Sequence, residues 1–555
     1  MQQIETIFCS SLTKILPGRA PEVRIVSGEA LRGERYSFQL AFKMPKAREF
    51  FKISVDSGFG KNLQIREAAW VPVNYVGFKY DEKVESDLPG LYPDLLTALP
   101  PDGWIPATEN WRSLWITVDV PRNAVPGVHK IKFTISQRPY MRPQICPEKI
   151  YTLDFPLEII DAVLPPQKLK NTHWFHCDCL ADYYNVEVFS EAHWEIIGNF
   201  MKNAARHGIN LLLTPIFTPP LDTQENGERL TVQLIDVYYE RGKYRFGFEK
   251  LSRWIELALK SGIKYFEMAH LFTQWGAKYT PKIIARVNGK EKRIFGWDVA
   301  SDSPAYRKFL AAFLPELTAF LKQKKLDKKV YFHCSDEPES EDFEFYSKNH
   351  RFIAQYLKDF KIIDAMSNVE YFTSGVITHP IPNEIQLEEF ISAGMKENWV
   401  YYSCVPERIY PARFIHMPSG RNRIFGTLLY KYNVCGFLHW GFNFYYSSLS
   451  RYMINPYCCN HSNYCYPPGD GFLVYPGKNG IPEDSIRHEV FFEALQDQRA
   501  LLLLEKLTDR RTVEALIDSF APSGTMKIND YPCDEKTVLD LRRQVNRMIA
   551  GNLHR

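Results

Sequence analysis

The spacing of apolar residues along the chain changes near residue 165. From about residue 20 to residue 163, apolar and polar residues alternate in short segments, most clearly over residues 151–159 (Tyr-Thr-Leu-Asp-Phe-Pro-Leu-Glu-Ile). Such alternation is typical of strands that bury one face. Because no convincing helix interrupts these segments, we expect residues 1–163 to form an N-terminal antiparallel β-sandwich. The Pro-rich segment from Pro89 to Pro106 is predicted to be a long surface loop.

Beyond a linker at Leu164-Pro165-Pro166-Gln167, short apolar runs alternate with amphipathic helical segments. The candidate strands are residues 172–177, 209–214, 264–269, 329–334, 362–365, 375–378, 399–403 and 436–440. The candidate helices between them are residues 190–206, 249–260, 303–321, 341–357, 384–392 and 421–432. Eight strands that alternate with helices predict an α/β fold with a (β/α)8 TIM-type barrel over residues 168–507. A doubly wound open sheet is the alternative, because the same alternation suits it.

Two further features complete the expected organisation. Aromatic pairs at residues 237–239 and 244–246 predict a small hairpin inserted between the second and third barrel strands. The tail has apolar residues at helical spacing over residues 483–507, 512–519 and 535–549. We therefore expect the last helices of the barrel to be followed by a C-terminal helical annex over residues 508–555.

Composition narrows the class of partner. The chain has 555 residues, of which 45% are hydrophobic, 14% aromatic and 24% charged, and 68 basic residues against 65 acidic ones leave a formal charge of +3. Since no block of like charges occurs, neither nucleic acid nor a membrane is an expected partner. The N-terminus lacks a basic segment followed by an apolar one, and no run approaches the ~20 apolar residues that span a bilayer, which predicts a cytoplasmic protein.

Cysteine usage gives no sign of a disulfide framework or a metal site. Eleven cysteines form an odd, scattered set, as reduced thiols do. Two groups contain several possible metal ligands, namely His173, His176, Cys177 and Cys179, and Cys458, Cys459, His461 and Cys465. Neither group has the paired Cys-x-x-Cys spacing of a structural zinc site. Without a Gly-x-Gly-x-x-Gly or Walker-type loop for a nucleotide, we expect no metal and no cofactor.

The strongest candidate for chemistry is the pair Asp336-Glu337. It follows the predicted strand at residues 329–334 and is stopped by Pro338, which cannot donate to a strand ladder. Adjacent side chains on a strand point to opposite faces, but past the last ladder bond the chain can turn and direct both to one ligand. Two carboxyls so close resist joint ionisation, so one pKa should rise, as a general acid near neutral pH requires. The alternative is a pair of solvated acids that cap the next helix.

Aromatic and polar side chains gather at the ends of other predicted strands, and the ends of barrel strands converge on one bowl. The group contains Trp174, Glu267, His270, Trp275, Tyr401, Tyr402, Trp440 and Asn443. Aromatic faces and polar groups together bind sugars, the rings against C–H surfaces and the polar groups on hydroxyls. For each ring, an ordinary place in the barrel core is the alternative.

Three separated motifs, in order, resemble the catalytic domain of glycoside hydrolase family 123 and its uncharacterised relatives. The first is Ser335-Asp336-Glu337-Pro338, and the second is residues 436–443 (Gly-Phe-Leu-His-Trp-Gly-Phe-Asn). The third is residues 469–477 (Gly-Asp-Gly-Phe-Leu-Val-Tyr-Pro-Gly), followed by Ser485-Ile486-Arg487 and Gln496-Asp497. The resemblance covers roughly residues 170–504, and an N-terminal β-sandwich also fits that family.

The resemblance implies removal of terminal β-linked N-acetylhexosamine, with N-acetylgalactosamine favoured, by a retaining, substrate-assisted mechanism through an oxazolinium intermediate. In that mechanism Glu337 is the general acid and Asp336 holds the substrate's acetamido N–H. Topology alone selects the candidates for binding the sugar, which are Trp174, His270, Trp275, Tyr402, Trp440 and Asn443. The expected partner is therefore a carbohydrate substrate containing N-acetylhexosamine.

Two other hypotheses stay open at the level of sequence. In the first, the chain hydrolyses a sugar without an acetamido group by ordinary paired carboxylates, Glu337 with Glu267 or Asp178. In the second, the barrel binds carbohydrate without catalysis. The oligomeric state is not indicated by any pattern in the sequence.

Overall fold

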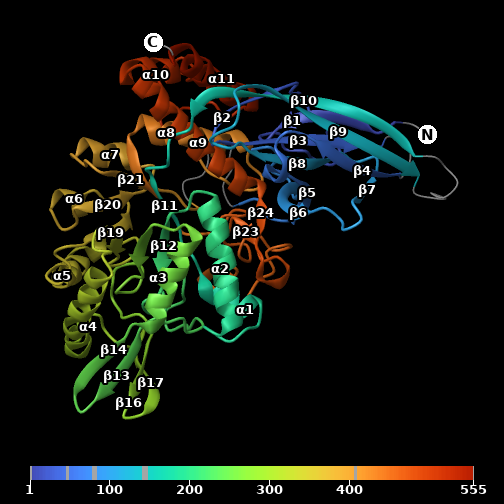
Figure 1. The fold of residues 1–555 in the computed structure, drawn as a ribbon. Coiled ribbons are helices and arrows are strands. Elements are labelled where there is room, and N and C mark those ends of the chain that lie inside the picture. Colours follow the sequence, from blue (N-terminus) through green and yellow to red (C-terminus); the bar gives the residue numbers. More distant parts are fainter. Residues whose placement is uncertain (1–2, 45–48, 78–83, 140–147, 405–408, 554–555) are drawn as a thin grey trace.

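A computed structural model describes residues 3–44, 49–77, 84–139, 148–404 and 409–553 (Figure 1). It is a mixed α/β protein with a strand-rich N-terminal region, a nearly closed barrel of eight parallel strands and a group of C-terminal helices. The predicted α/β barrel is thus confirmed, and the open doubly wound alternative is wrong. The divisions at residues 163–168 and 507–508 stay predictions. In the described part of the chain, no helix combines the length and the apolarity that crossing a membrane would need.

The N-terminal region consists of two sheets that share a core. In order across the first sheet lie β1 (Glu5–Ser10), β3 (Arg35–Lys43), β8 (Arg112–Asp119), β5 (Leu63–Val73), β6 (Gly90–Ala98), β24 (Glu483–Ser485) and β23 (Val474–Tyr475). In order across the second lie β2 (Gly28–Arg32), β10 (Lys149–Val163), β9 (Gly127–Pro139), β4 (Glu49–Asp56) and β7 (Trp104–Ala107). Phe38 of β3 stacks on Phe155 of β10 with ring centroids 4.0 Å apart, so apolar faces of both sheets meet.

Two details of this region differ from the sequence-based expectation. The pairing is not wholly antiparallel, because β2 and β10 run parallel. The predicted loop from Pro89 to Pro106 is also wrong, since it contains β6 and β7. Pro93 fits within β6 because it lies opposite Trp70, next to a register shift, where a strand tolerates a missing N–H.

The barrel strands lie within a few residues of their predicted positions. They are β11 (Lys170–His173), β12 (Leu211–Thr214), β15 (Tyr265–Met268), β18 (Val330–Phe332), β19 (Lys361–Met366), β20 (His379–Pro382), β21 (Asn398–Tyr401) and β22 (Val434–His439). They follow chain order around the barrel from β11 to β20, and β22 and β21 continue from the other side of β11. A single parallel bridge between Asn383 and Tyr401 joins the two ends, so the barrel is almost closed.

The sixth strand is the one that the sequence misplaces. It was expected at residues 375–378, but β20 begins at His379 and reads His-Pro-Ile-Pro. Proline has no N–H for a ladder, so the pattern argues against a strand there. The structure accommodates both prolines because β20 pairs with β19 on one side, and on the other side the described chain has a single bridge, at Asn383 just after β20.

Helices surround the barrel and pack over its end. They are α1 (Cys177–Tyr183), α2 (Glu191–Arg206), α3 (Glu249–Ser261), α4 (Pro304–Gln323), α5 (Phe343–Ala354), α6 (Glu370–Thr373), α7 (Leu387–Ser392) and α8 (Ser419–Lys431), then α9 (Ile486–Leu507), α10 (Arg510–Asp518) and α11 (Glu535–Asn552). The hydroxyls of Ser190 and Ser303 cap α2 and α4 by accepting a bond from the N–H three residues on.

The predicted hairpin is present as β13 (Asp236–Glu240) and β14 (Lys243–Gly247). It belongs to a larger four-stranded sheet with β16 (Ile283–Val287) and β17 (Lys290–Phe295), which projects from the lower end of the barrel in Figure 1. The sequence analysis missed the second pair because β17 starts with the charged run Lys-Glu-Lys-Arg, which has no buried alternation.

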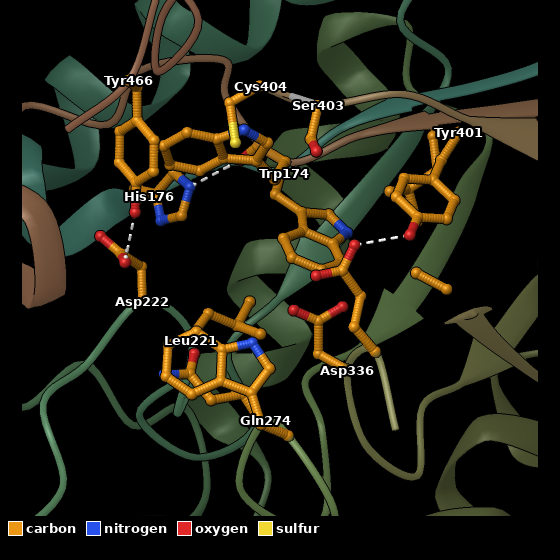
Figure 2. A pocket seen from close by; sticks show the side chains of 15 residues that line it. Trp174, His176, Leu221, Asp222, Gln274, Asp336, Tyr401, Ser403, Cys404 and Tyr466 are labelled. Carbon is orange, nitrogen blue, oxygen red and sulfur yellow. Dashed lines mark hydrogen bonds between the residues drawn. The ribbon is translucent and has the colours of Figure 1, made fainter. Parts of the chain in front are cut away.

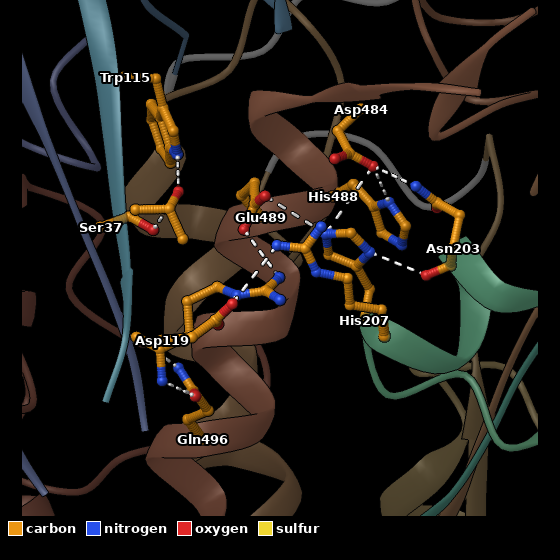
Figure 3. A network of polar contacts seen from close by, with 12 residues as sticks. Ser37, Trp115, Asp119, Asn203, His207, Asp484, His488, Glu489 and Gln496 are labelled. Atoms are coloured by element: carbon orange, nitrogen blue, oxygen red, sulfur yellow. Dashed lines mark hydrogen bonds and ion pairs between the residues drawn. The ribbon is translucent and has the colours of Figure 1, made fainter. Parts of the chain in front are cut away.

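A buried network of charges joins the N-terminal sheets to the barrel (Figure 3). Arg66 of β5 bonds Asp484 of β24 and Glu489 of α9, and Arg35 of β3 also contacts Glu489. Burial alone would raise the pKa of Glu489, but the two guanidinium groups outweigh it and hold that pKa well below its ordinary range. Because each charge here is paired, removing one partner would leave an uncompensated buried charge.

We expect Arg66→Met to destabilise the protein by about 3–5 kcal/mol, since it leaves Asp484 and Glu489 buried without this cation. The urea midpoint of unfolding measures the loss. As a control, Arg253→Met removes the exposed pair between Arg253 and Glu191 and should leave the midpoint unchanged. Equal midpoints for the two variants would contradict the importance of the buried network.

Candidate active site

The end of β18 delivers two acids to one pocket. After Phe332 the chain is fixed by the amide of Cys334, which donates to Asp364, and by the hydroxyl of Ser335, which donates to the carbonyl of Thr273. The carbonyl of Asp336 then accepts a bond from the amide of Trp275, at 2.9 Å. Glu337 has a φ of 43°, in the left-handed region that costs an ordinary residue free energy. This turn allows Asp336 and Glu337, neighbours in the chain, to face the same hollow.

That pocket lies at the carboxyl ends of the barrel strands and has a volume of about 170 Å³ (Figure 2). Its lining combines the acid pair with three tryptophans, two tyrosines, a third carboxyl group and a few smaller residues. The lining residues are Trp174, His176, Leu221, Asp222, Gln274, Trp275, Asp336, Glu337, Ala365, Tyr401, Ser403, Cys404, Leu438, Trp440 and Tyr466.

The three tryptophans form much of the apolar wall, together with Leu221, Ala365 and Leu438. Trp174 is buried, whereas Trp275 is 48% exposed and therefore stands at the rim. The indole N–H of Trp440 donates to Asp470 at 2.8 Å, which fixes the plane of that ring. Asp470 belongs to the Gly-Asp-Gly motif, so one role of that motif is to orient the ring of Trp440. Fixed aromatic faces of this kind suit the C–H surface of a sugar ring.

Burial controls the ionisation of the acid pair. It raises the pKa of Asp336 well above the ordinary value, and the charge of Glu337 raises it further, while the His333 imidazole opposes the shift. Burial also raises the pKa of Glu337, and a hydrogen bond from the Tyr401 hydroxyl, at 2.5 Å, opposes that shift. Because the two carboxyls resist joint ionisation, the pair holds one proton over a range of pH where a solvated acid would have lost it.

Across the pocket from Asp336 and Tyr401 lies Asp222 (Figure 2). Its carboxylate accepts bonds from the Tyr466 hydroxyl at 2.6 Å and from the amide of Leu449 at 3.1 Å. The sequence analysis missed Asp222 because its loop has neither alternation nor a strand directly before it. The only signal was its place after β12, at the end of the barrel where functional groups collect.

A buried ion triad lies beneath the acid pair. His333 contacts Glu267 through Nε2 at 2.9 Å and Asp364 through Nδ1 at 3.2 Å. These bonds outweigh the effect of burial and raise the pKa of His333 to about 9, so the imidazole is charged at neutral pH. Glu267 therefore lies inside the barrel, bonded to His333, and does not line the pocket. Asp178, likewise outside the lining, is held by Arg229 at 2.8 Å.

Of the residues predicted to bind a sugar, the structure brings Trp174, Trp275 and Trp440 to the pocket, but not the other three. His270 is buried between Trp174 and His333, with its ring 4.3 Å from that of His333. Asn443 uses its amide on the backbone of His176. Tyr402 packs on Phe437, and Tyr401 faces the pocket instead, because successive side chains of a strand point to opposite faces.

Two groups in the described part of the chain could offer three metal ligands within 4.8 Å, namely His207, Asp484 and His488, and His270, His333 and Asp364. In the first group, Arg66 and Asn203 already occupy the two oxygens of Asp484. In the second, both ring nitrogens of His333 are bonded to carboxylates. In each group, therefore, one of the three residues already has its ligand atoms bonded within the protein.

Comparison with known families and structures places this site in context. The family model described as "Glycoside hydrolase 123, catalytic domain" matches residues 174–504. A family 123 glycoside hydrolase from Clostridium perfringens, studied for its hydrolysis of glycolipid glycans, has a similar structure. Its TM-score is 0.71 at 17% identity, over 100% of this chain and 98% of that chain, which shows a shared fold. A search of curated proteins finds no match.

Two β-glucuronidases are far less similar. The one from Dictyoglomus thermophilum has a TM-score of 0.33 at 10% identity, over 89% of this chain and 97% of that chain. A calcium-binding mutant of β-glucuronidase 2 from Bacteroides uniformis has a TM-score of 0.28 at 9% identity, over 80% of this chain and 47% of that chain.

The left-handed backbone at Glu337 predicts an unusual order of stability. Glu337→Gly should be as stable as Glu337→Ala or more stable by about 0.5–1 kcal/mol, because alanine is strained at positive φ and glycine is not. Thermal unfolding of the two variants measures the difference. At Glu344, exposed in the helix α5, the order should be the ordinary one, with alanine more stable than glycine. A more stable Glu337→Ala would show that the turn is not strained.

Proposed function

The chain belongs to glycoside hydrolase family 123, and from this membership we propose that it removes terminal β-linked N-acetylhexosamine from glycosides, with N-acetylgalactosamine favoured. Family membership supports a glycosidase with a carbohydrate substrate. The observation that supports the finer proposal is the pocket in which Asp336 and Glu337 stand side by side among tryptophan rings. The proposed mechanism is retaining and substrate-assisted, through an oxazolinium intermediate.

The shared proton of the acid pair explains how the two roles are divided. The N–H of a bound acetamido group is only a donor, so it bonds best to an ionised carboxylate at Asp336. Burial raises the pKa of Glu337. An ionised Asp336 beside it would favour the protonated form of Glu337 further, because neighbouring carboxyls resist joint ionisation. Substrate binding thus leaves the proton on Glu337, next to the bond that must break. The His333 imidazolium further favours the negative charge on Asp336.

Glu337 then gives its proton to the glycosidic oxygen as the bond from that oxygen to C1 breaks. The amide oxygen of the substrate forms a bond to C1 from the opposite face, which gives the oxazolinium ring and places its positive charge near Asp336. In the second half, the Glu337 carboxylate takes a proton from a water molecule that opens the ring at C1. Two inversions at C1 retain the configuration, and the reacting groups are those of the chain, the substrate and water.

The remaining lining suits recognition of the sugar. Trp174 and Trp440 offer ring faces for its C–H surface, and Trp275 stands at the rim. Asp222, oriented by Tyr466, can accept bonds from sugar hydroxyls on the side opposite the acid pair. These contacts would hold C1 near Glu337, where geometry governs the rate.

The alternative with ordinary paired carboxylates has less support. Its proposed partners Glu267 and Asp178 do not line the pocket, and each is already bonded to a cationic side chain. Only Asp222 offers another lining carboxylate among the described residues. A panel of aryl β-glycosides separates the hypotheses, since turnover of a galactoside or glucoside without turnover of 2-acetamido sugars would favour paired carboxylates. Sugar binding without any product would favour a non-catalytic protein.

The proposed roles predict different effects at the two acids. Glu337→Gln should lower kcat/KM for a poor leaving group by about 10²–10⁴-fold, and less for an activated aryl leaving group that needs no proton. Asp336→Asn should lower the rate for both kinds of leaving group, because the acetamido group loses its charged acceptor. A thiazoline that mimics the cyclic intermediate should inhibit the parent protein and bind more weakly to Asp336→Asn. Failure of the thiazoline to bind the parent would count heavily against the mechanism.

The pH dependence can be tested through Tyr401. Its hydroxyl favours the ionised form of Glu337, so Tyr401→Phe should raise the pKa of Glu337 further. Activity that needs protonated Glu337 is lost as the pH rises through that pKa, so the alkaline limb of kcat/KM should move to higher pH. Tyr402→Phe is the matched control, because its buried hydroxyl has no hydrogen-bond partner in the described structure. An unmoved limb in Tyr401→Phe would contradict the assignment of Glu337 as the acid.

A further inference from the structure

A second hollow adjoins the pocket and shares one of its walls. It has a volume of about 520 Å³ and lies where the loops after β18 and β19 meet α7. Glu337, Tyr401, Ser403 and Cys404 line both hollows. Asp336 lines only the first. The two acids therefore differ in what they can reach.

This difference predicts how a bound glycoside is oriented across the two hollows. An acid that protonates a glycosidic oxygen must stand between the sugar that is cleaved off and the group that leaves. Glu337 stands at such a boundary, whereas Asp336 faces the pocket alone, where the acetamido group would be held. On the basis of the proposed function, we propose that the second hollow holds the leaving group, and that it accepts an uncharged sugar and rejects an anionic one.

The lining of the second hollow suits a hydroxylated leaving group. Tyr401 is its only aromatic side chain among the described residues, so it lacks the ring platforms of the first pocket. The amide of Asn368 and the hydroxyl of Ser340 lie 2.9 Å apart on its wall, and both can exchange hydrogen bonds with sugar hydroxyls. Recognition here depends on polar contacts in a roomy hollow rather than on stacking.

The charge of the hollow decides which sugars it admits. Glu339 and Glu389 line it and are both exposed, and none of the described lining residues is basic. A sulfate or carboxylate on the leaving sugar would meet these two carboxylates without a compensating cation among the described lining residues. Like charges in water at about 4 Å repel enough to change an equilibrium about fivefold for each pair, and salt screens the effect.

The test compares two substrates that differ only in charge on the leaving sugar. These are an N-acetylhexosaminyl-β-1,3-galactose and the same disaccharide with a sulfate on its galactose. We expect the parent protein to cleave the neutral disaccharide with kcat/KM at least about fivefold higher, and the ratio to shrink as salt is added. In the double variant Glu339→Gln/Glu389→Gln the ratio should fall towards one. The readout is the ratio of the two rates, because the charge of Glu339 also raises the pKa of Glu337 and its removal affects both disaccharides alike.

The matched control is Glu388→Gln, which changes the same charge on the same helix, α7, at a residue that does not line the hollow. It should keep the ratio of the parent protein. Equal cleavage of the two disaccharides by the parent protein, or an unchanged ratio in the double variant, would overturn the inference. A parent protein that cleaves no 2-acetamido aryl glycoside would instead overturn the proposed function, so the two failures are distinct.

Discussion

The site depends on one constraint, which is that two adjacent carboxyl groups are partly buried and directed at the same hollow. An extended strand would point them to opposite faces. The left-handed backbone at Glu337 removes that difference, and backbone bonds to Trp275 and Ala365 hold the turn in place. Because the strain and the desolvation of both acids cost free energy, the surrounding fold must supply it, which is a common property of functional sites.

Much of the barrel can be understood as the support of this pair. His333 places a positive charge beneath it, and two fully buried carboxylates, Glu267 and Asp364, hold that charge. The Tyr401 hydroxyl donates a hydrogen bond to Glu337. Tyr401 ends β21, and it also makes the bridge with Asn383 that joins the two ends of the barrel sheet. The pair is thus fixed by β18, by the strands on both sides of it and by β21. Its ionisation is set by neighbours from different parts of the chain, which no local sequence window contains.

The sequence predicts the framework better than the details. Eight strands could be placed because buried parallel strands read as short apolar runs, and the acid pair could be found because Pro338 marks the end of one of them. The prolines of β20 and the charged start of β17 conceal two strands, although their partners β19 and β16 are the strands just before them in the sequence. The sequence placed Tyr402 at the pocket, where the structure has its neighbour Tyr401. A shift of one residue along a strand moves a side chain from one face of the sheet to the other. Asp222 could be placed at the pocket only from the three-dimensional structure, since its loop has no periodic pattern.

The most direct test of the account is the sensitivity of the rate to the substrate's own amide. In a series of aryl β-glycosides whose N-acetyl group carries zero, one, two and three fluorine atoms, each fluorine makes the amide oxygen a weaker nucleophile while the leaving group stays the same. If Asp336 directs that oxygen to C1, kcat/KM should fall steeply and steadily along the series. A rate that does not depend on the number of fluorine atoms would show that the amide takes no part, and would contradict the joint role of Asp336 and Glu337.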